Sequence, residues 1–340
     1  MGDEKRLYEI AVALGPGHTA KRFLRLKELE FEEIVWPKEG EHWLWRKGQT
    51  RQELLESVDR WRSGLDGTGI EFSLYGDSAF PSALLETKPC PAILFIQGTL
   101  PVQKSVAIVG SRAAHRWAVD ATAELVAGFV EAGFAVISGG ALGVDAAAHH
   151  ATLKFGGKTV AVMGSGHQNL YPLRNIELYG EIRRAGALVS PFACHEPPRK
   201  PHFPQRNQII AALSEAVVVV EAQHRSGALN TAKWAKLLGK PVFSSPGSPG
   251  GACLMAGGAG LATSAEDVLG VLSGARSIRR APPDDPELLE VVRALQDRAM
   301  TIDALAKHLQ QPLARLALLL IRLELSGHIR SLAGGRYTIG

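Results

Sequence analysis

The sequence predicts an α/β protein with a parallel-sheet domain in the middle, a helical module before it and a winged helix after it. Three observations predict this order. Helical spacing dominates the first segment, short apolar strands alternate with amphipathic helices in the middle, and three helices followed by a hairpin close the chain. We expect the domains to span 1–70, 71–275 and 281–340.

The N-terminal module is expected to be helical. The run YEIAVAL leads into Gly15-Pro16-Gly17, and TAKRFLRLKEL continues with a helical period. This turn is typical of a helix–hairpin–helix module, which presents its amides to a DNA phosphate. A plain turn between packed helices, as in a SAM-like module, explains it equally well. Because aliphatic residues are scarce here, tryptophans are expected to fill the small core: Trp36, Trp43, Trp45 and Trp61.

The middle of the chain alternates strands with helices. Short apolar runs predict strands at 105–110, 134–138, 159–164, 187–190, 216–222 and 241–245. Amphipathic runs between them predict helices at 118–133, 144–155, 175–186 and 231–239. Because the strand runs are apolar throughout, they indicate a parallel sheet covered by helices on both faces.

The end of the chain has the order of a winged helix. Residues 276–286, RSIRRAPPDDP, resemble a linker, and three helical runs then precede a hairpin closed by Gly334-Gly335. The expected recognition helix is apolar and carries only Arg315 and Arg322, one of them balanced by Glu324. Proteins that read duplex DNA need more positive charge on this helix, so we expect it to pack or to contact protein.

Composition excludes several classes of protein. No apolar run approaches the roughly 18 residues that cross a bilayer, and the acidic start MGDEKR is unlike a signal peptide. The three cysteines, Cys90, Cys194 and Cys253, have no metal-binding spacing. We therefore expect a cytoplasmic protein with no metal, no cofactor and no membrane contact.

Positive charge is concentrated in the middle of the chain. Residues 71–280 carry 19 Lys and Arg against 14 Asp and Glu, whereas the flanking segments are balanced or slightly acidic. An anionic partner is therefore expected on the middle domain. Ordinary surface lysine and arginine explain the excess equally well.

Three glycine-bearing turns each follow a predicted strand. In an open parallel sheet, ligands bind beyond the carboxyl ends of the strands, where glycine lets them approach the backbone and helix N-termini point N–H groups outward. Arg112 adds a bidentate donor to the first turn. The turns therefore predict a phosphate-binding rim made of Gly110, Ser111, Arg112, Ser138, Gly139, Gly140, Gly143, Gly164 and Gly166.

A basic, proline-rich stretch, PPRKPHFPQRN, occupies residues 197–207. Cations beside an aromatic ring suit a single nucleic-acid strand, because the cations meet phosphates while a base stacks on the ring. Spacing equally allows Phe203 to plug into the core and Arg206 to be a structural ion-pair partner. This stretch and the loop after the strand at 216–222 extend the candidate site by Lys200, Phe203, Arg206, Asn207, Arg225, Ser226, Gly227 and Thr231.

No catalytic pattern is recognisable. The sequence has no GxxxxGK[ST] loop, no GxGxxG after a strand, and no paired carboxylates or Ser/His/Asp order. Asp145 is expected to cap a helix or tie a loop. His149 and His150 are adjacent on a predicted helix and do not share a face, so they are not expected to bind a metal.

Taken in order, these motifs resemble the DNA-processing protein A (DprA/Smf) family. The resemblance covers most of the chain. It rests on LYGDSAFPSALL (74–85), AIVGSR (107–112), SGGALGVDAAAH (138–149), Tyr171-Pro172 with Asn175, FPQRNQIIAALS (203–214), SGALNTA (226–232), Pro246-Gly247 and a C-terminal GGRYTI. It implies an extended Rossmann-type middle domain, and it implies DNA contacts from Arg112, Lys200, Phe203 and Arg206.

The chain departs from the family pattern at a few positions. Arg225 stands where a lysine commonly precedes the SGS motif, and it keeps the positive charge. Asn230 occupies a normally apolar place, Gln208 a normally basic one, and Pro191 replaces the usual glutamate. These departures are expected to act on loop conformation and DNA affinity.

The resemblance implies a non-enzymatic protein that binds and protects single-stranded DNA, forms a homodimer and helps load the RecA recombinase in natural transformation or recombination. One alternative is a nucleotide-processing enzyme of the lysine-decarboxylase-like Rossmann group. That group needs a helix-borne glutamate after a GGxGT motif, and this chain offers Lys233 and Trp234 instead. The other alternative is a gene regulator that reads duplex DNA with the winged helix.

Overall fold

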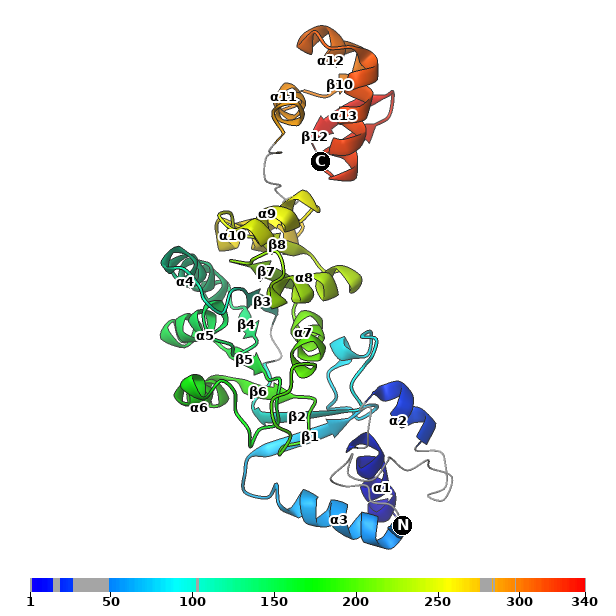
Figure 1. Cartoon of the computed structure of the whole chain (residues 1–340), viewed down its shortest axis with the longest axis vertical. Coiled ribbons are helices and arrows are strands. Elements are labelled where there is room, and N and C mark those ends of the chain that lie inside the picture. The colour runs from blue at the N-terminus through cyan, green and yellow to red at the C-terminus, as the bar shows by residue number, and fades with distance from the viewer. Residues whose placement is uncertain are drawn as a thin grey trace.

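The computed structural model describes residues 2–14, 19–26, 49–101, 104–275, 283, 285–296 and 298–339. The winged helix lies at one end of the molecule, the N-terminal helices lie at the other, and a large sheet occupies the middle (Figure 1). Several sequence predictions fall outside the described residues: those for Gly15-Pro16-Gly17, Trp36, Trp43, Trp45 and most of the linker at 276–286.

A nine-stranded sheet forms the centre of the described structure. Its strands are β1 (Ile70–Leu74), β2 (Ile93–Gly98), β3 (Ser105–Val109), β4 (Ala135–Ser138), β5 (Thr159–Val162), β6 (Ala187–Ser190), β7 (Ala216–Val219), β8 (Val242–Ser244) and β9 (Gly260–Leu261). Their spatial order is β1-β2-β6-β5-β4-β3-β7-β8-β9. All pairings from β6 to β9 are parallel, whereas β2 pairs antiparallel with both β1 and β6.

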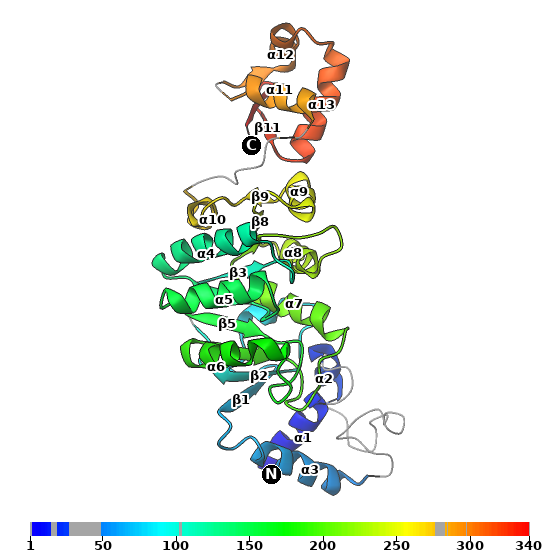
Figure 2. The same ribbon diagram turned by 60° about the vertical axis from the view of Figure 1, so that its left-hand side comes forward.

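Helices cover both faces of this sheet. They are α4 (Arg116–Glu131), α5 (Val144–Lys154), α6 (Ile176–Ala185), α7 (His202–Leu213), α8 (Gly227–Leu237), α9 (Pro249–Ala256) and α10 (Ala265–Leu272). Helices α4, α5, α6 and α10 pack on one face, and α7 and α8 pack on the other (Figure 2). In β3, Val106 and Ile108 face the first group while Ala107 and Val109 face the second. Burial on both faces explains why the strand sequences are apolar throughout.

The predicted fold class is confirmed, with additions at both edges of the sheet. The sequence predicts β3 to β8 and the helices α4, α5, α6 and α8. It does not predict β9 at one edge, nor the antiparallel strands β1 and β2 at the other. This edge packs against the N-terminal helices α1 (Gly2–Leu14) and α3 (Arg51–Ser63), through residues that include Ile10, Leu54 and Phe95. The short helix α2 (Ala20–Leu26) completes the described part of the module.

The winged helix has its own core. Its elements are α11 (Pro286–Ala294), β10 (Met300–Thr301), α12 (Ile302–Leu309), α13 (Leu313–Leu325), β11 (Ile329–Leu332) and β12 (Arg336–Ile339). Leu316, Leu320 and Leu323 of α13 pack with residues of α11 and α12. The strand β10, which the sequence does not predict, pairs with β12 and extends the hairpin to three strands.

Both arginines of α13 pair with acidic residues outside that helix. Arg322 pairs with Asp285 at 3.1 Å, and Arg315 pairs with Glu287 at 2.6 Å, so both arginines reach the start of α11. Glu324, which offsets one positive charge in the sequence of the helix, accepts a hydrogen bond from the backbone N–H of Ser331 at 3.1 Å. The contacts that neutralise the recognition helix come from a neighbouring helix and not from its own sequence.

Candidate functional site

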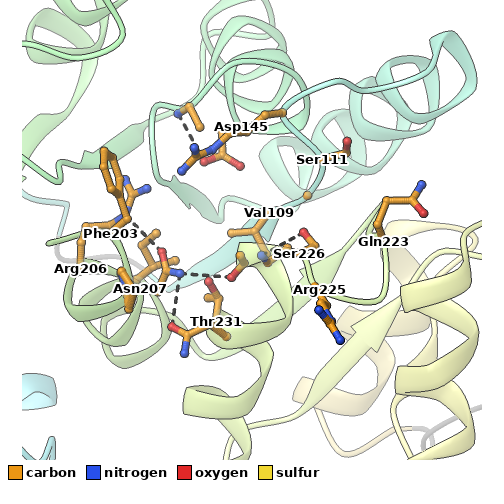
Figure 3. A pocket seen from close by; sticks show the side chains of 18 of the residues that line it. Val109, Ser111, Asp145, Phe203, Arg206, Asn207, Gln223, Arg225, Ser226 and Thr231 are labelled. Atoms are coloured by element: carbon orange, nitrogen blue, oxygen red, sulfur yellow. Dashed lines mark hydrogen bonds between the residues drawn. The ribbon is translucent and has the colours of Figure 1, made fainter. Parts of the chain in front are cut away.

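A cavity of about 750 Å³ opens at the carboxyl ends of β3 and β7. These strands are neighbours, but β4 lies beyond β3 on one side and β8 lies beyond β7 on the other. Such a reversal of strand order leaves a crevice beyond the strand ends, where ligands of parallel sheets bind. Figure 3 shows this cavity, here called the main pocket, between Ser111 after β3, Phe203 and Asn207 of α7, and Thr231 of α8.

Three exposed cations surround the mouth of the main pocket: Arg112, Lys200 and Arg225. None of them forms an ion pair within the described part of the chain. The nearby Arg199, in contrast, pairs with Glu196 at 3.0 Å. The mouth therefore carries uncompensated positive charge, which attracts phosphate groups.

Phe203 lies on the pocket wall between two guanidinium groups. The ring centroid is 5.2 Å from Cζ of Arg112 and 5.8 Å from Cζ of Arg206, which are cation–π distances. The half-buried ring also rests on Gly164, where an added Cβ would come within 2.8 Å of it. Phe203 is thus neither buried in the core nor an unsupported surface side chain. It is fixed in place with part of the ring open to the pocket.

Arg206 supports the pocket from behind. Its side chain is buried, and Nη1 donates hydrogen bonds to the carbonyl oxygens of Gly139 and Val162. Nε donates to Oδ1 of Asn207 at 3.2 Å. Burial lowers the pKa of Arg206, and the negative charge of Asp145 opposes that change. Since the donors point at protein carbonyls, the geometry favours the structural alternative for Arg206.

Asp145 ties the turn after β4, as the sequence predicts. Its Oδ2 accepts hydrogen bonds from the backbone N–H groups of Gly139 at 3.1 Å and Ala141 at 3.4 Å. Burial raises the pKa of this carboxyl group, while Arg206 and the backbone donors act in the opposite direction. Asp145 lines the main pocket, but its carboxylate is already used within the protein.

The glycines of the three turns are closely packed by protein atoms on the side where a Cβ would stand. An added Cβ would collide with Val144 at Gly110, with Arg206 at Gly139 and with Phe203 at Gly164. Gly140, Gly143 and Gly166 are equally tight, against Tyr179, the Ser111 carbonyl and the Ala193 carbonyl. Protein atoms therefore fill the space of a Cβ at these glycines. Gly110 also lines the main pocket, and ligand contacts at the other five remain a prediction. Gly227, at the start of α8, has no atom within 4 Å of an added Cβ.

The candidate residues divide into a lining set and a supporting set. The main pocket brings together Gly110, Ser111, Arg112, Lys200, Phe203, Arg206, Asn207, Arg225, Ser226, Gly227 and Thr231. Residues outside its lining are Ser138, Gly139, Gly140, Gly143, Gly164 and Gly166. Ser138, for example, is buried and donates a hydrogen bond to the carbonyl oxygen of Ile108 at 2.6 Å.

Several residues of the pocket lining are missing from the predicted set, among them Tyr171, Gln223 and Asn230. Asn230 stands three residues after Gly227 on α8, so helical spacing places both on one face, and that signal was present in the sequence. Its Oδ1 is 3.4 Å from Nδ2 of Asn207, which also donates to the carbonyl oxygen of Gly227 at 3.2 Å. Tyr171 reaches the pocket from the loop after β5, and no local sequence pattern predicts that contact.

Neither a metal centre nor a membrane span is found in the described residues. They contain no group of three or more His, Cys, Asp or Glu arranged to hold a metal ion. His149 is buried while His150 is exposed, so the two rings point to different surroundings, as expected. No described helix is long and apolar enough to cross a membrane.

Two family models match the chain. The model described as DNA recombination-mediator protein A matches residues 71–273, which is more than half of the sequence. The chain belongs to this DNA recombination-mediator protein A family. A second model, described as the DprA winged helix domain, matches residues 276–335. The predicted DprA/Smf membership is thereby confirmed.

Relatives with curated descriptions agree with this assignment. Protein Smf of Escherichia coli is 36% identical over 281 residues, covering 76% of this chain and 75% of that protein. The DNA processing protein DprA of Streptococcus pneumoniae is 40% identical over 201 residues, covering 57% of this chain and 71% of that protein. The chain is therefore a DNA-processing protein of a recombination family.

Two solved structures share the fold. The X-ray structure of DNA processing protein A from Streptococcus pneumoniae superposes with a TM-score of 0.57 at 34% identity, covering 65% of this chain and 82% of that one. DNA processing protein A from Helicobacter pylori superposes with a TM-score of 0.54 at 26% identity, covering 61% of this chain and 98% of that one. The latter structure is described as giving insight into a single-stranded DNA binding mode.

Proposed function

We propose that the main pocket binds single-stranded DNA without catalysis, and that the protein protects such strands and helps load the RecA recombinase on them. The observation that carries this proposal is the mouth of the pocket. Arg112, Lys200 and Arg225 offer exposed positive charge beside the partly exposed ring of Phe203. Cations that track phosphates beside rings that stack on bases are the usual elements of single-strand binding.

The comparison with the Helicobacter pylori protein supports the same ligand, because that relative is described as having a single-stranded DNA binding mode. Family membership supports a function in recombination. Natural transformation and delivery of the strand to RecA are proposed from the family resemblance.

The alternative of a nucleotide-processing enzyme finds no support in the pocket. That enzyme group needs a glutamate beside the substrate. Among the described residues that line the pocket, Asp145 is the only Asp or Glu, and it is buried with its Oδ2 bonded to backbone N–H groups. Binding without chemistry is therefore the function that we propose.

Fluorescence anisotropy of a labelled oligothymidine tests the proposal. The Arg112→Ala, Lys200→Ala double variant should lose most of the affinity for the single strand, because two of the three mouth cations are gone. A matched control removes two exposed arginines at the end of α6, Arg183→Ala with Arg184→Ala, and should keep the affinity. A duplex of equal length should bind weakly in every case.

Two results would count against the proposal. The first is wild-type protein that does not bind the single strand. The second is an equal loss of affinity in the two double variants, because charge anywhere on the surface would then explain binding. Delivery to RecA is tested by the rate of RecA filament assembly on strands covered with single-strand-binding protein. This protein should accelerate assembly, and the Arg112, Lys200 double variant should not.

A further inference from the structure

A short segment beside the main pocket exposes three large apolar side chains. Tyr171 is 47% exposed, Leu173 is 72% exposed and Ile176 is 53% exposed. They lie in and around the 3₁₀ turn η3 (Leu173–Asn175), just before and at the start of α6. Exposed apolar residues scattered singly need no explanation, but a group of them at the edge of a pocket indicates a binding surface.

This segment is held firmly. The side-chain amide Nδ2 of Asn175 donates to the carbonyl oxygens of Gly140 at 2.9 Å and Ala141 at 3.2 Å. The buried Tyr179 hydroxyl lies 2.6 Å from the carbonyl oxygen of Tyr171 and 2.9 Å from that of Gly140. The exposed side chains are thus displayed on an anchored backbone, so a ligand does not have to order the segment when it binds.

The segment meets the main pocket at Tyr171. Tyr171 lines that pocket, and its ring centroid is 5.9 Å from that of Phe203. A second hollow of about 50 Å³ lies between Leu142, Tyr171, Pro172 and Phe203, with Arg112 on its wall. That volume holds one or two water molecules and not a base. A second base would therefore lie across the mouth of the hollow, against the Tyr171 ring.

We propose that Tyr171, Leu173 and Ile176 form a stacking surface for the nucleotides that follow the one in the main pocket. This inference rests on the proposed function, and it extends the contacts from the nucleotide in the main pocket to the nucleotides that follow it on the same strand. Arg174, exposed within the same segment, adds a cation for a phosphate. A protein partner is the weaker candidate, because three side chains are far fewer than the roughly 20 residues a side of a stable protein interface.

The test compares four variants of the full chain with an oligothymidine long enough to pass the pocket. Tyr171→Ala should weaken binding about 5- to 150-fold, the range expected for one lost stacking contact. Tyr171→Phe keeps the ring and should retain the affinity, whereas Leu173→Ala should weaken binding. The loop should stay folded in all of them, because Tyr179 holds Tyr171 through its backbone carbonyl.

Leu237→Ala is the matched control. Leu237 is 65% exposed and ends α8, about 15 Å from the pocket end of that helix. It should leave the affinity unchanged. Equal binding by Tyr171→Ala and wild type would overturn the stacking surface while leaving the proposed function intact, provided that the Arg112, Lys200 double variant still fails to bind.

Other results would also overturn the inference. If Leu173→Ala changes the mass of the protein in solution but not its DNA affinity, the segment is a protein interface. If Tyr171→Phe is as defective as Tyr171→Ala, the ring is not what binds. If wild-type protein does not bind single strands at all, the proposed function fails and the stacking surface fails with it.

Discussion

At the residue scale, the site depends on side chains that pack against glycines, in the space that a Cβ atom would occupy. Phe203 rests on Gly164, Arg206 lies over Gly139, and Tyr179 lies against Gly140. The glycines therefore fix the positions of the rings and guanidinium groups that form the pocket, although none of these three lines the main pocket itself. A small substitution behind the pocket should consequently change binding at its surface.

Gly164→Ala tests this relation. The new methyl group would come within 2.8 Å of the Phe203 ring and displace it, so single-strand affinity should fall by about 5-fold or more. Gly180→Ala in α6 is the control, since its added Cβ meets only Arg184 at 3.9 Å and helices favour alanine over glycine. Anisotropy and thermal unfolding should be measured together. A Gly164→Ala variant that folds and binds normally would contradict the relation.

A second residue-scale prediction concerns two buried histidines. Burial lowers the pKa of His149 to about 3 and that of His167 to about 4, from an ordinary value of 6.5. Below pH 6.5 the unfolded chain binds protons at these rings and the folded chain does not. Their contribution to stability is therefore complete above pH 6.5 and is lost as the pH falls toward 4.

The size of this loss is measurable. As the pH falls from 7 to 5, each ring lowers the free energy of unfolding by about 2 kcal/mol, because the loss is about 1.4 kcal/mol per pH unit below 6.5. His149→Gln should flatten the pH dependence. His150→Gln should change it much less, because burial is the main cause of the lowered pKa of His149 and the charge of His150 is a smaller one. Urea unfolding at the two pH values measures this difference. Identical pH dependence in both variants would show that His149 is not the titrating group.

At the element scale, α7 and α13 differ in what their polar residues do. The basic stretch at 197–207 is not a loop throughout, because α7 begins at His202 and places Phe203 and Asn207 one turn apart. Both therefore reach the pocket from a rigid helix. The arginines of α13 are paired with acidic residues at the start of α11, which leaves little free charge for duplex DNA.

Deletion of residues 281–340 tests the winged helix. Its apolar core is separate from those of the sheet domain, so removal should leave the rest of the protein folded. Single-strand affinity should stay within a few-fold of wild type, and duplex binding should stay weak in both forms. Loss of most single-strand affinity in a folded deletion variant would show that the module contributes to the site.

At the scale of the whole molecule, the predicted homodimer sets how salt affects binding. Among the described residues, one protomer offers three unpaired cations at its pocket. For a short oligonucleotide, a plot of the logarithm of affinity against the logarithm of salt concentration should therefore have a slope of about −2. If a dimer holds a long strand at two pockets, the slope should approach about −4, and splitting the dimer should sharply lower the affinity. Anisotropy over a salt series, with oligonucleotides of increasing length, measures both values. A slope that does not change with length would contradict two-site binding.

The sequence by itself determined the strands β3 to β8, the helices α4, α5, α6 and α8, and the elements of the winged helix except β10. It also identified Arg112, Lys200, Phe203 and Arg225 as pocket residues. These features follow from apolar periodicity, from turns at strand ends and from the basic stretch at 197–207, which are local properties of the chain. Family membership followed from the order of the motifs.

Only the tertiary structure decided which residues support the pocket and which line it. The burial of Arg206 depends on carbonyl groups at Gly139 and Val162, and Tyr171 reaches Phe203 from a distant part of the sequence. The edge strands β1 and β2 likewise depend on α1 and α3 to cover them. Contacts of this kind join segments that are far apart in the chain, so no local pattern contains them. Periodicity determines that a residue is in a helix or strand, and packing determines what its side chain meets.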